Sequence, residues 1–105
     1  MPVSLSVLST QYVIVPLTIL GPDAPDPTSD PVSFAFKPSG TDPSGPDWVT
    51  GSWVAETLNG QYLMQCLVGP SGGTPLAIGS YVIWNKITDS PEVPVFQSGV
   101  LAITP

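Results

Sequence analysis

The sequence contains no histidine and only two basic residues, Lys37 and Lys86. Histidine is the side chain that most often serves as a general base near neutral pH, so Ser-His-Asp and Cys-His arrangements cannot be built. Binding to a phosphate backbone requires clustered Lys and Arg, which two isolated lysines do not supply. We therefore expect no nucleic-acid partner and no catalytic site of these kinds.

Cysteine and long apolar segments are also scarce. Cys66 is the only cysteine, so no internal disulfide can form, and its apolar neighbours predict an ordinary buried thiol. The longest apolar run, residues 12–20, is too short to cross a bilayer and is broken by Pro16. The first residues carry no basic stretch of the kind that opens a secretory signal. We expect no membrane partner, and assembly in a cytoplasm unless the chain leaves in a larger particle.

The composition is that of one folded domain with an unusual surface. The chain has 105 residues, 42% of them apolar, and only 10% are charged, with a net charge of −6. This length supports a single hydrophobic core. A surface with so few ions depends on Ser, Thr, Asn, Gln, Gly and Pro for solubility. Such surfaces suit a protein packed into an assembly, although many secreted domains share them.

Apolar and polar residues alternate along several short runs, which is the pattern of strands with one buried face. The runs are residues 3–7, 32–37, 52–57, 62–68, 81–87 and 100–104. Residues 12–20 are apolar on both faces, as in a central strand, but Pro16 demands a bulge or an edge position. The Asn-Gly pair at 59–60 predicts a hairpin between the two runs that flank it.

Loops rich in proline and glycine separate these runs, at residues 21–31, 37–47, 69–75 and 89–94. No stretch shows the period of an α-helix. The pattern predicts an all-β fold, an immunoglobulin-like β-sandwich of seven or eight short antiparallel strands without a disulfide. A small barrel stays open as an alternative. We expect one domain over residues 1–105, in which residues 1–9 form an N-terminal arm or strand.

Acidic residues offer the few candidates for chemistry. Asp89 with Glu92, or Glu56 with a loop aspartate, could form a carboxylate pair, but acids beside proline more often cap turns. A calcium loop at Asp23, Asp26 and Asp30 does not have EF-hand spacing. The glycines at 69–75 lack the lysine and the helix of a phosphate-binding loop. We therefore predict no catalytic residue, no metal and no cofactor.

Three tryptophans are the remaining candidates for a binding surface. Trp53 lies in an alternating run and is expected in the core, whereas Trp48 and Trp84 are expected to pack in the core or at an interface. Trp84 has the opposite parity from Tyr81 and Ile83, so it points to the other face of its strand. If the tryptophans were exposed together, they could instead stack on sugars.

Three motifs of the chain resemble a known group of proteins. They are "V-x-F-A-F-x-P-x-G" at residues 32–40, "D-W-x-x-x-x-W" at 47–53, and "G-x-Y-x-x-W-x-K-I-T-D-S-P-E-x-P-V" at 79–95. Together they resemble small β-sandwich proteins encoded among the virion structural genes of tailed phages that infect actinobacteria. The resemblance covers most of the chain from Tyr12 onward, and residues 21–31 lie outside it.

The resemblance implies a non-enzymatic structural protein of the virion, assembled in the host cytoplasm. Its position would be on the capsid as a decoration, at the head-to-tail connection, or in the tail or baseplate. The expected partners are capsid, connector or tail subunits, in many symmetric copies. We expect these partners to dock at the residues Trp48, Trp84, Pro91, Glu92 and Pro94.

Two other functions are weighed against this one. A carbohydrate-binding module with exposed aromatics is the main alternative, and an enzyme is the weakest. For an assembly role, the terminal strands, up to Leu8 and from Val100, are the segments expected to be exchanged between subunits. Deletion of residues 1–9 should then weaken incorporation into the particle more than it weakens folding.

Overall fold

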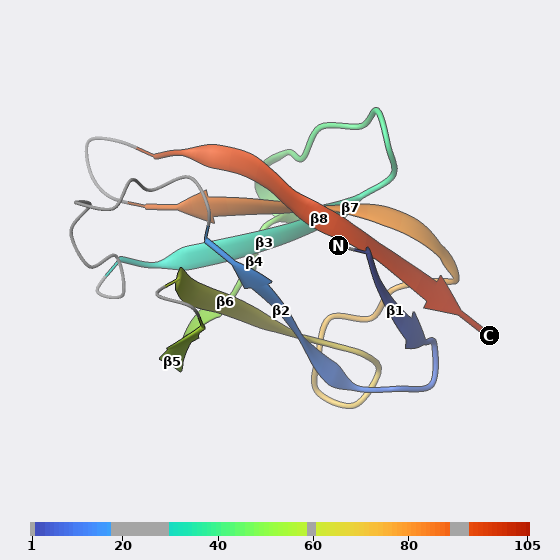
Figure 1. The fold of residues 1–105 in the computed structure, drawn as a ribbon. Helices are drawn as coiled ribbons and strands as arrows, with labels where there is room; N and C mark the ends of the chain where they lie inside the picture. The colour runs from blue at the N-terminus through green and yellow to red at the C-terminus, as the bar shows by residue number, and fades with distance from the viewer. Residues whose placement is uncertain (1, 18–29, 59–60, 89–92) are drawn as a thin grey trace.

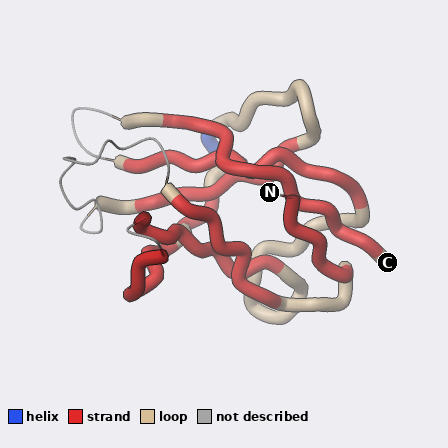
Figure 2. Tube along the Cα trace, viewed as in Figure 1, coloured by secondary structure: helices blue, strands red, loops and turns tan. Residues whose placement is uncertain are grey.

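A computed structural model describes residues 2–17, 30–58, 61–88 and 93–105, which are mostly β-strand (Figures 1 and 2). The strands of the described chain are β1 Pro2–Ser6, β2 Gln11–Pro16, β3 Val32–Lys37, β4 Val49–Thr50, β5 Ser52–Leu58, β6 Gln61–Val68, β7 Gly79–Ile87 and β8 Val95–Thr104. A short 3-10 helix, η1, covers Gly45–Asp47. Within these ranges no helix is long and apolar enough to cross a membrane.

The strands form two sheets. One has five strands in the order β1-β8-β7-β3-β4, and the other has three in the order β2-β6-β5 (Figure 1). β5 and β6 pair antiparallel, with Leu58 opposite Gln61, which confirms the hairpin predicted from the sequence. The turn itself, residues 59–60, lies outside the described residues.

One pair of strands differs from the antiparallel expectation. β1 runs parallel to β8, with Leu5 opposite Ile103. Parallel neighbours need a long connection, and here most of the chain lies between them. The segment expected as an arm or strand is therefore a sheet strand of its own chain, and Leu5 is only 8% exposed in the core.

The inner faces of the two sheets share one hydrophobic core. The buried cluster is Leu5, Val13, Val15, Leu17, Val32, Phe34, Phe36, Met64, Cys66, Val68, Ile83, Ile87, Leu101 and Ile103. Burial of each such side chain contributes about 1.5–3 kcal/mol, so hydrophobic contacts hold the sheets together without a disulfide. Cys66 is free and buried, as predicted.

β2 is an edge strand, as Pro16 allowed, and not the central strand that its two apolar faces suggested. Among the described strands it pairs with β6 alone, and Tyr12 and Ile14 are 55% and 46% exposed. Residues 18–20 of the predicted run lie outside the described residues. Pro16 is the last residue of β2, and a proline without an N–H is tolerated there because β2 is an edge strand. Apolar side chains on both faces of a strand therefore do not require burial on both faces.

β8 begins at Val95, earlier than the run 100–104 expected from the sequence. A bulge interrupts its pairing with β7, because Gly99 lies opposite Ile83 while Gln97 lies opposite Trp84. Ser98 is the extra residue, and it shifts the alternation of the strand by one position. That shift hides residues 95–98 from a search for a strict period of two.

The bulge also satisfies a buried polar side chain. Asn85 is fully buried on the inner face of β7. Its Nδ2 donates to the Ser33 carbonyl at 3.3 Å, and its Oδ1 accepts from the Ser98 hydroxyl. Both ends of the amide therefore have a partner, as burial of such a group requires.

Candidate docking site

The outer face of the five-stranded sheet, which points away from the core, carries Trp84. This residue lies between Ala35 of β3 and Gln97 of β8. Residues directly opposite each other on antiparallel strands lie on the same face of the sheet. By the same pairing, the outer face also holds Ser33 and Lys37 of β3, Val82 and Lys86 of β7, and Val95 and Val100 of β8.

An apolar strip runs across this outer face. Val95 and Val100 are 47% and 45% exposed, and Val82 and Trp84 are half-buried. Ala35 belongs to the same face but has no exposed area, so neighbouring side chains cover its methyl group. The outer face thus has apolar area that the described chain covers only in part.

The indole N–H of Trp84 lies in an unusual environment. Nε1 is buried and has no hydrogen-bond partner among the described atoms. A buried donor without a partner costs about 1–3 kcal/mol. The Trp84 side chain therefore packs through the apolar area of its ring, and its N–H makes no hydrogen bond to the described residues.

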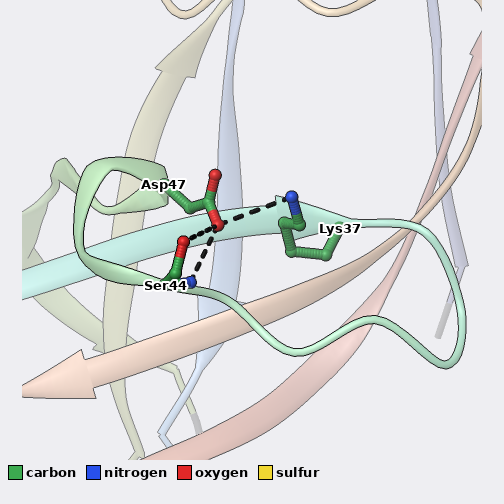
Figure 3. A network of polar contacts seen from close by, with 3 residues as sticks. All are labelled: Lys37, Ser44 and Asp47. Atoms are coloured by element: carbon green, nitrogen blue, oxygen red, sulfur yellow. Dashed lines mark hydrogen bonds and ion pairs between the residues drawn. The ribbon is translucent and has the colours of Figure 1, made fainter.

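A polar network fixes the loop that follows β3 (Figure 3). Asp47 Oδ2 accepts from the Ser44 backbone N–H at 2.8 Å and from the Ser44 hydroxyl at 3.0 Å, and Lys37 Nζ lies 3.4 Å away. The Ser44 backbone N–H, the Ser44 hydroxyl and the Lys37 charge lower the pKa of Asp47 below its ordinary value of 3.8. The carboxylate thus links the turn of η1 to the end of β3.

The same loop leads to Trp48, which lies beside the outer face. Lys86 Nζ is 4.7 Å from the centroid of the Trp48 ring, a cation–π geometry. Lys86 belongs to the outer face, so this contact brings Trp48 to the same side of the sheet as Trp84. Lys37 and Lys86, the only two bases of the chain, therefore both position the loop residues at this face.

The bend before β8 contains the other predicted docking residues. Pro94 is half-buried, and its carbonyl accepts from the Ile87 N–H at 3.1 Å. This bond fixes the start of β8 against the end of β7, next to the exposed Val93 and Val95. Pro91 and Glu92 lie outside the described residues. The structure therefore groups Trp48 and Trp84 on one face and puts Pro94 at its end.

Most of the remaining chemical candidates lie outside what the structure describes. These are Asp23, Asp26, Asp89 and Glu92, together with the side chain of Glu56. The Asp30 carbonyl accepts from the Trp53 indole N–H at 2.9 Å. Within the described part of the chain, no three His, Cys, Asp or Glu side chains gather as a metal ligand set would.

The alternation of the sequence grouped Val82 and Lys86 with Trp84 on one face, and the pairing of β7 with β3 and β8 confirms it. Sequence reasoning missed Val95 and Val100 as members of that face, and it missed the pair Asn85 and Ser98. Val95 could not be grouped, because the bulge hid its strand. Asn85 shares the parity of Ile83 and Ile87, which is the signal of a buried amide that needs a partner.

Comparison with known proteins adds no relative. No family model matches the chain. No curated protein and no solved structure shows a significant match either.

Proposed function

We propose that the chain is a non-enzymatic structural protein of a tailed-phage particle. It binds neighbouring virion proteins through the outer face of the five-stranded sheet. The observation that carries this proposal is the position, in the fold, of the three motifs that resemble the phage proteins. Residues 32–40 contain β3, residues 47–53 contain Trp48, β4 and the start of β5, and residues 79–95 contain β7 and the start of β8. Apart from Ser52 and Trp53 of β5, the strand residues of the motifs thus belong to the sheet that carries Trp84.

The outer face has the chemistry of a protein-binding surface. Aromatic side chains at the centre of an interface contribute much of its binding energy, and Trp48 and Trp84 supply two indoles there. A rigid sheet and a loop fixed by Lys37 and Lys86 hold them in place before binding, which lowers the entropy cost of association. The position in the particle, on the capsid, at the head-to-tail connection or in the tail, stays open within the proposal.

We also assign the fold, within this proposal, to the immunoglobulin-like sandwiches. The strand order supports the assignment. When β2 is matched to strand B, the sheet β2-β6-β5 corresponds to B-E-D, and β8-β7-β3 corresponds to G-F-C. The short β4 then takes the position of strand C′ beside β3. Domains of this architecture serve as rigid binding modules in many proteins without sequence similarity.

Carbohydrate binding gains no support from the tryptophans. A sugar platform requires coplanar, exposed rings, whereas all three tryptophans are half-buried. Trp53 packs against the core and donates to the Asp30 carbonyl. Trp84 has its N–H buried. Trp53 thus lies on the inner face of the three-stranded sheet, apart from Trp48 and Trp84 at the outer face of the five-stranded sheet.

Purified particles of a phage that encodes this chain provide the test. We expect mass spectrometry to detect the chain in intact particles, and cryo-EM to show it in many symmetric copies. Its presence in infected-cell lysate but absence from purified particles would refute the proposal.

A pair of surface variants tests the outer face itself. Val100→Lys introduces a charge into the apolar strip at a position that is 45% exposed, so the fold should survive while incorporation into particles falls about tenfold or more. Ser52→Lys is the control, because it adds the same charge at an exposed position on the outer face of the three-stranded sheet. Equal incorporation of both variants would show that partners dock elsewhere.

A further inference from the structure

The free edge of β2 presents unpaired backbone groups. The Leu17 N–H donates to the Tyr62 carbonyl at 2.8 Å, in register with the rest of the β2–β6 pair. In an antiparallel ladder, residues that exchange hydrogen bonds alternate with residues that do not. The N–H and C=O groups of Val13 and Val15 therefore point toward β6. Those of the intervening residues point away from it.

Tyr12 and Ile14 are these intervening residues. Their N–H and C=O groups form a row along the edge of the three-stranded sheet, and the described residues supply no backbone partner for them. The nitrogen of Pro16 faces the same edge, where the lack of an N–H removes no bond to β6. The edge is therefore a short template of donors and acceptors that ends at Pro16.

This template is complementary to itself. When a second β2 approaches antiparallel with Val13 opposite Val13, Tyr12 lies opposite the partner's Ile14 and Ile14 lies opposite the partner's Tyr12. Each outward N–H then meets an outward carbonyl. Such an arrangement has a two-fold axis and closes after two chains.

Side chains favour the same pairing. Tyr12 and Ile14 are 55% and 46% exposed on one face of the strand, and Leu8 in the preceding turn is 84% exposed. Three of the seven large exposed apolar side chains of the described chain thus lie on or beside β2. An aromatic residue opposite a β-branched one contributes about 0.2–1 kcal/mol per pair.

Charge does not oppose the pairing of two copies at this edge. The chain carries a net charge of −6, but no charged residue occurs before Asp23 or within β6. Natural edge strands usually carry charges that prevent pairing, and this strand has only Pro16 at its end. Two β2 strands can therefore pair without like charges on the paired residues themselves.

We infer that β2 pairs with β2 of a second copy of this chain, joining the two three-stranded sheets into one. The inference does not depend on the proposed function, because it concerns the isolated chain. One short strand pair buries less than a standard interface of about 1,600 Å². The dimer is accordingly weak, with a Kd of about 0.1 mM, and it forms where copies are locally concentrated.

Sedimentation equilibrium of the full chain between about 10 µM and 1 mM tests the inference. We expect a monomer–dimer equilibrium, and we expect Ile14→Lys to weaken it about tenfold. Val100→Lys is the matched control, since it adds the same charge at an apolar position of nearly equal exposure on the other sheet. Both variants lower the net negative charge, so general repulsion cannot explain a selective loss.

Cysteine trapping tests the register. Residues that exchange hydrogen bonds across an antiparallel pair have Cα atoms about 5.5 Å apart, which suits a disulfide. A mixture of Tyr12→Cys and Ile14→Cys chains should therefore cross-link faster than either variant alone, while the buried Cys66 is the same background in all samples. The inference is wrong if the native chain stays monomeric up to 1 mM, if Val100→Lys weakens the dimer as much as Ile14→Lys, or if the mixture has no advantage.

Discussion

The hydrogen bond between Ser98 and Asn85 gives a sharp prediction about stability. Ser98→Ala removes the donor to Asn85 Oδ1 and leaves that oxygen buried without a partner. Such a loss costs about 1–3 kcal/mol. When Asn85 is first replaced by Leu, the Ser98 hydroxyl can donate to the Ile83 carbonyl, which lies 3.4 Å away. Ser98→Ala should then lower the free energy of unfolding by less than it does in the wild type. The interaction energy between the two substitutions should be about 1 kcal/mol or more.

Urea unfolding of the wild type, both single variants and the double variant measures this coupling. A loss of 1 kcal/mol corresponds to a fall in Tm of about 4–8 °C for a domain near this size. Ser80→Ala is the control, because Ser80 is exposed on the same strand as Asn85, and it should change stability by less than about 0.5 kcal/mol. If Ser98→Ala costs the same free energy with and without Asn85, the bulge does not serve the buried amide.

Three further outcomes are expected. Trp84→Phe should be neutral or stabilising because it removes an N–H without a partner, whereas Trp84→Ala should destabilise by about 3 kcal/mol; thermal unfolding compares the two. The lowered pKa of Asp47 means that its ionised form is favoured in the folded state, so its contribution is present above its ordinary value of 3.8 and is lost as the pH falls through the folded value. The Ser44 amide resonance in NMR should therefore move only below about pH 4, and an equal shift in Asp47→Asn would refute this. Deletion of residues 1–9 should lower the free energy of unfolding as well as incorporation, because it removes Leu5 from the core; calorimetry that finds an unchanged Tm would contradict it.

Strands with a strict alternation were predictable from the sequence. The runs 32–37 and 81–87 emerged as β3 and most of β7, and the Asn-Gly pair located the β5–β6 hairpin. The parallel pairing of β1 with β8 was not predictable, because it joins distant segments and no local pattern encodes it. The bulge at Ser98 likewise hid the first part of β8, since one extra residue reverses the parity of all that follows.

Among the candidate docking residues, the alternation of the sequence could predict the position of Trp84 only. The alternation indicated that Trp84 turns away from Tyr81 and Ile83, and the pairing of β7 with β3 and β8 put it on the outer face. The position of Trp48 depends on a loop whose shape is fixed by contacts with Lys37 and Lys86. Such contacts between residues far apart in the sequence leave no periodic signal.

The pairing of β1 with β8 also constrains the order in which the chain can fold during synthesis. β1 is made early, but its partner begins only at Val95. Until the ribosome has released β8, β1 has no neighbouring strand with which to form backbone hydrogen bonds. Contacts between such distant segments slow folding, so the five-stranded sheet is completed last. A nascent chain truncated before residue 95 should accordingly be sensitive to proteases near its N-terminus, and the complete chain should not.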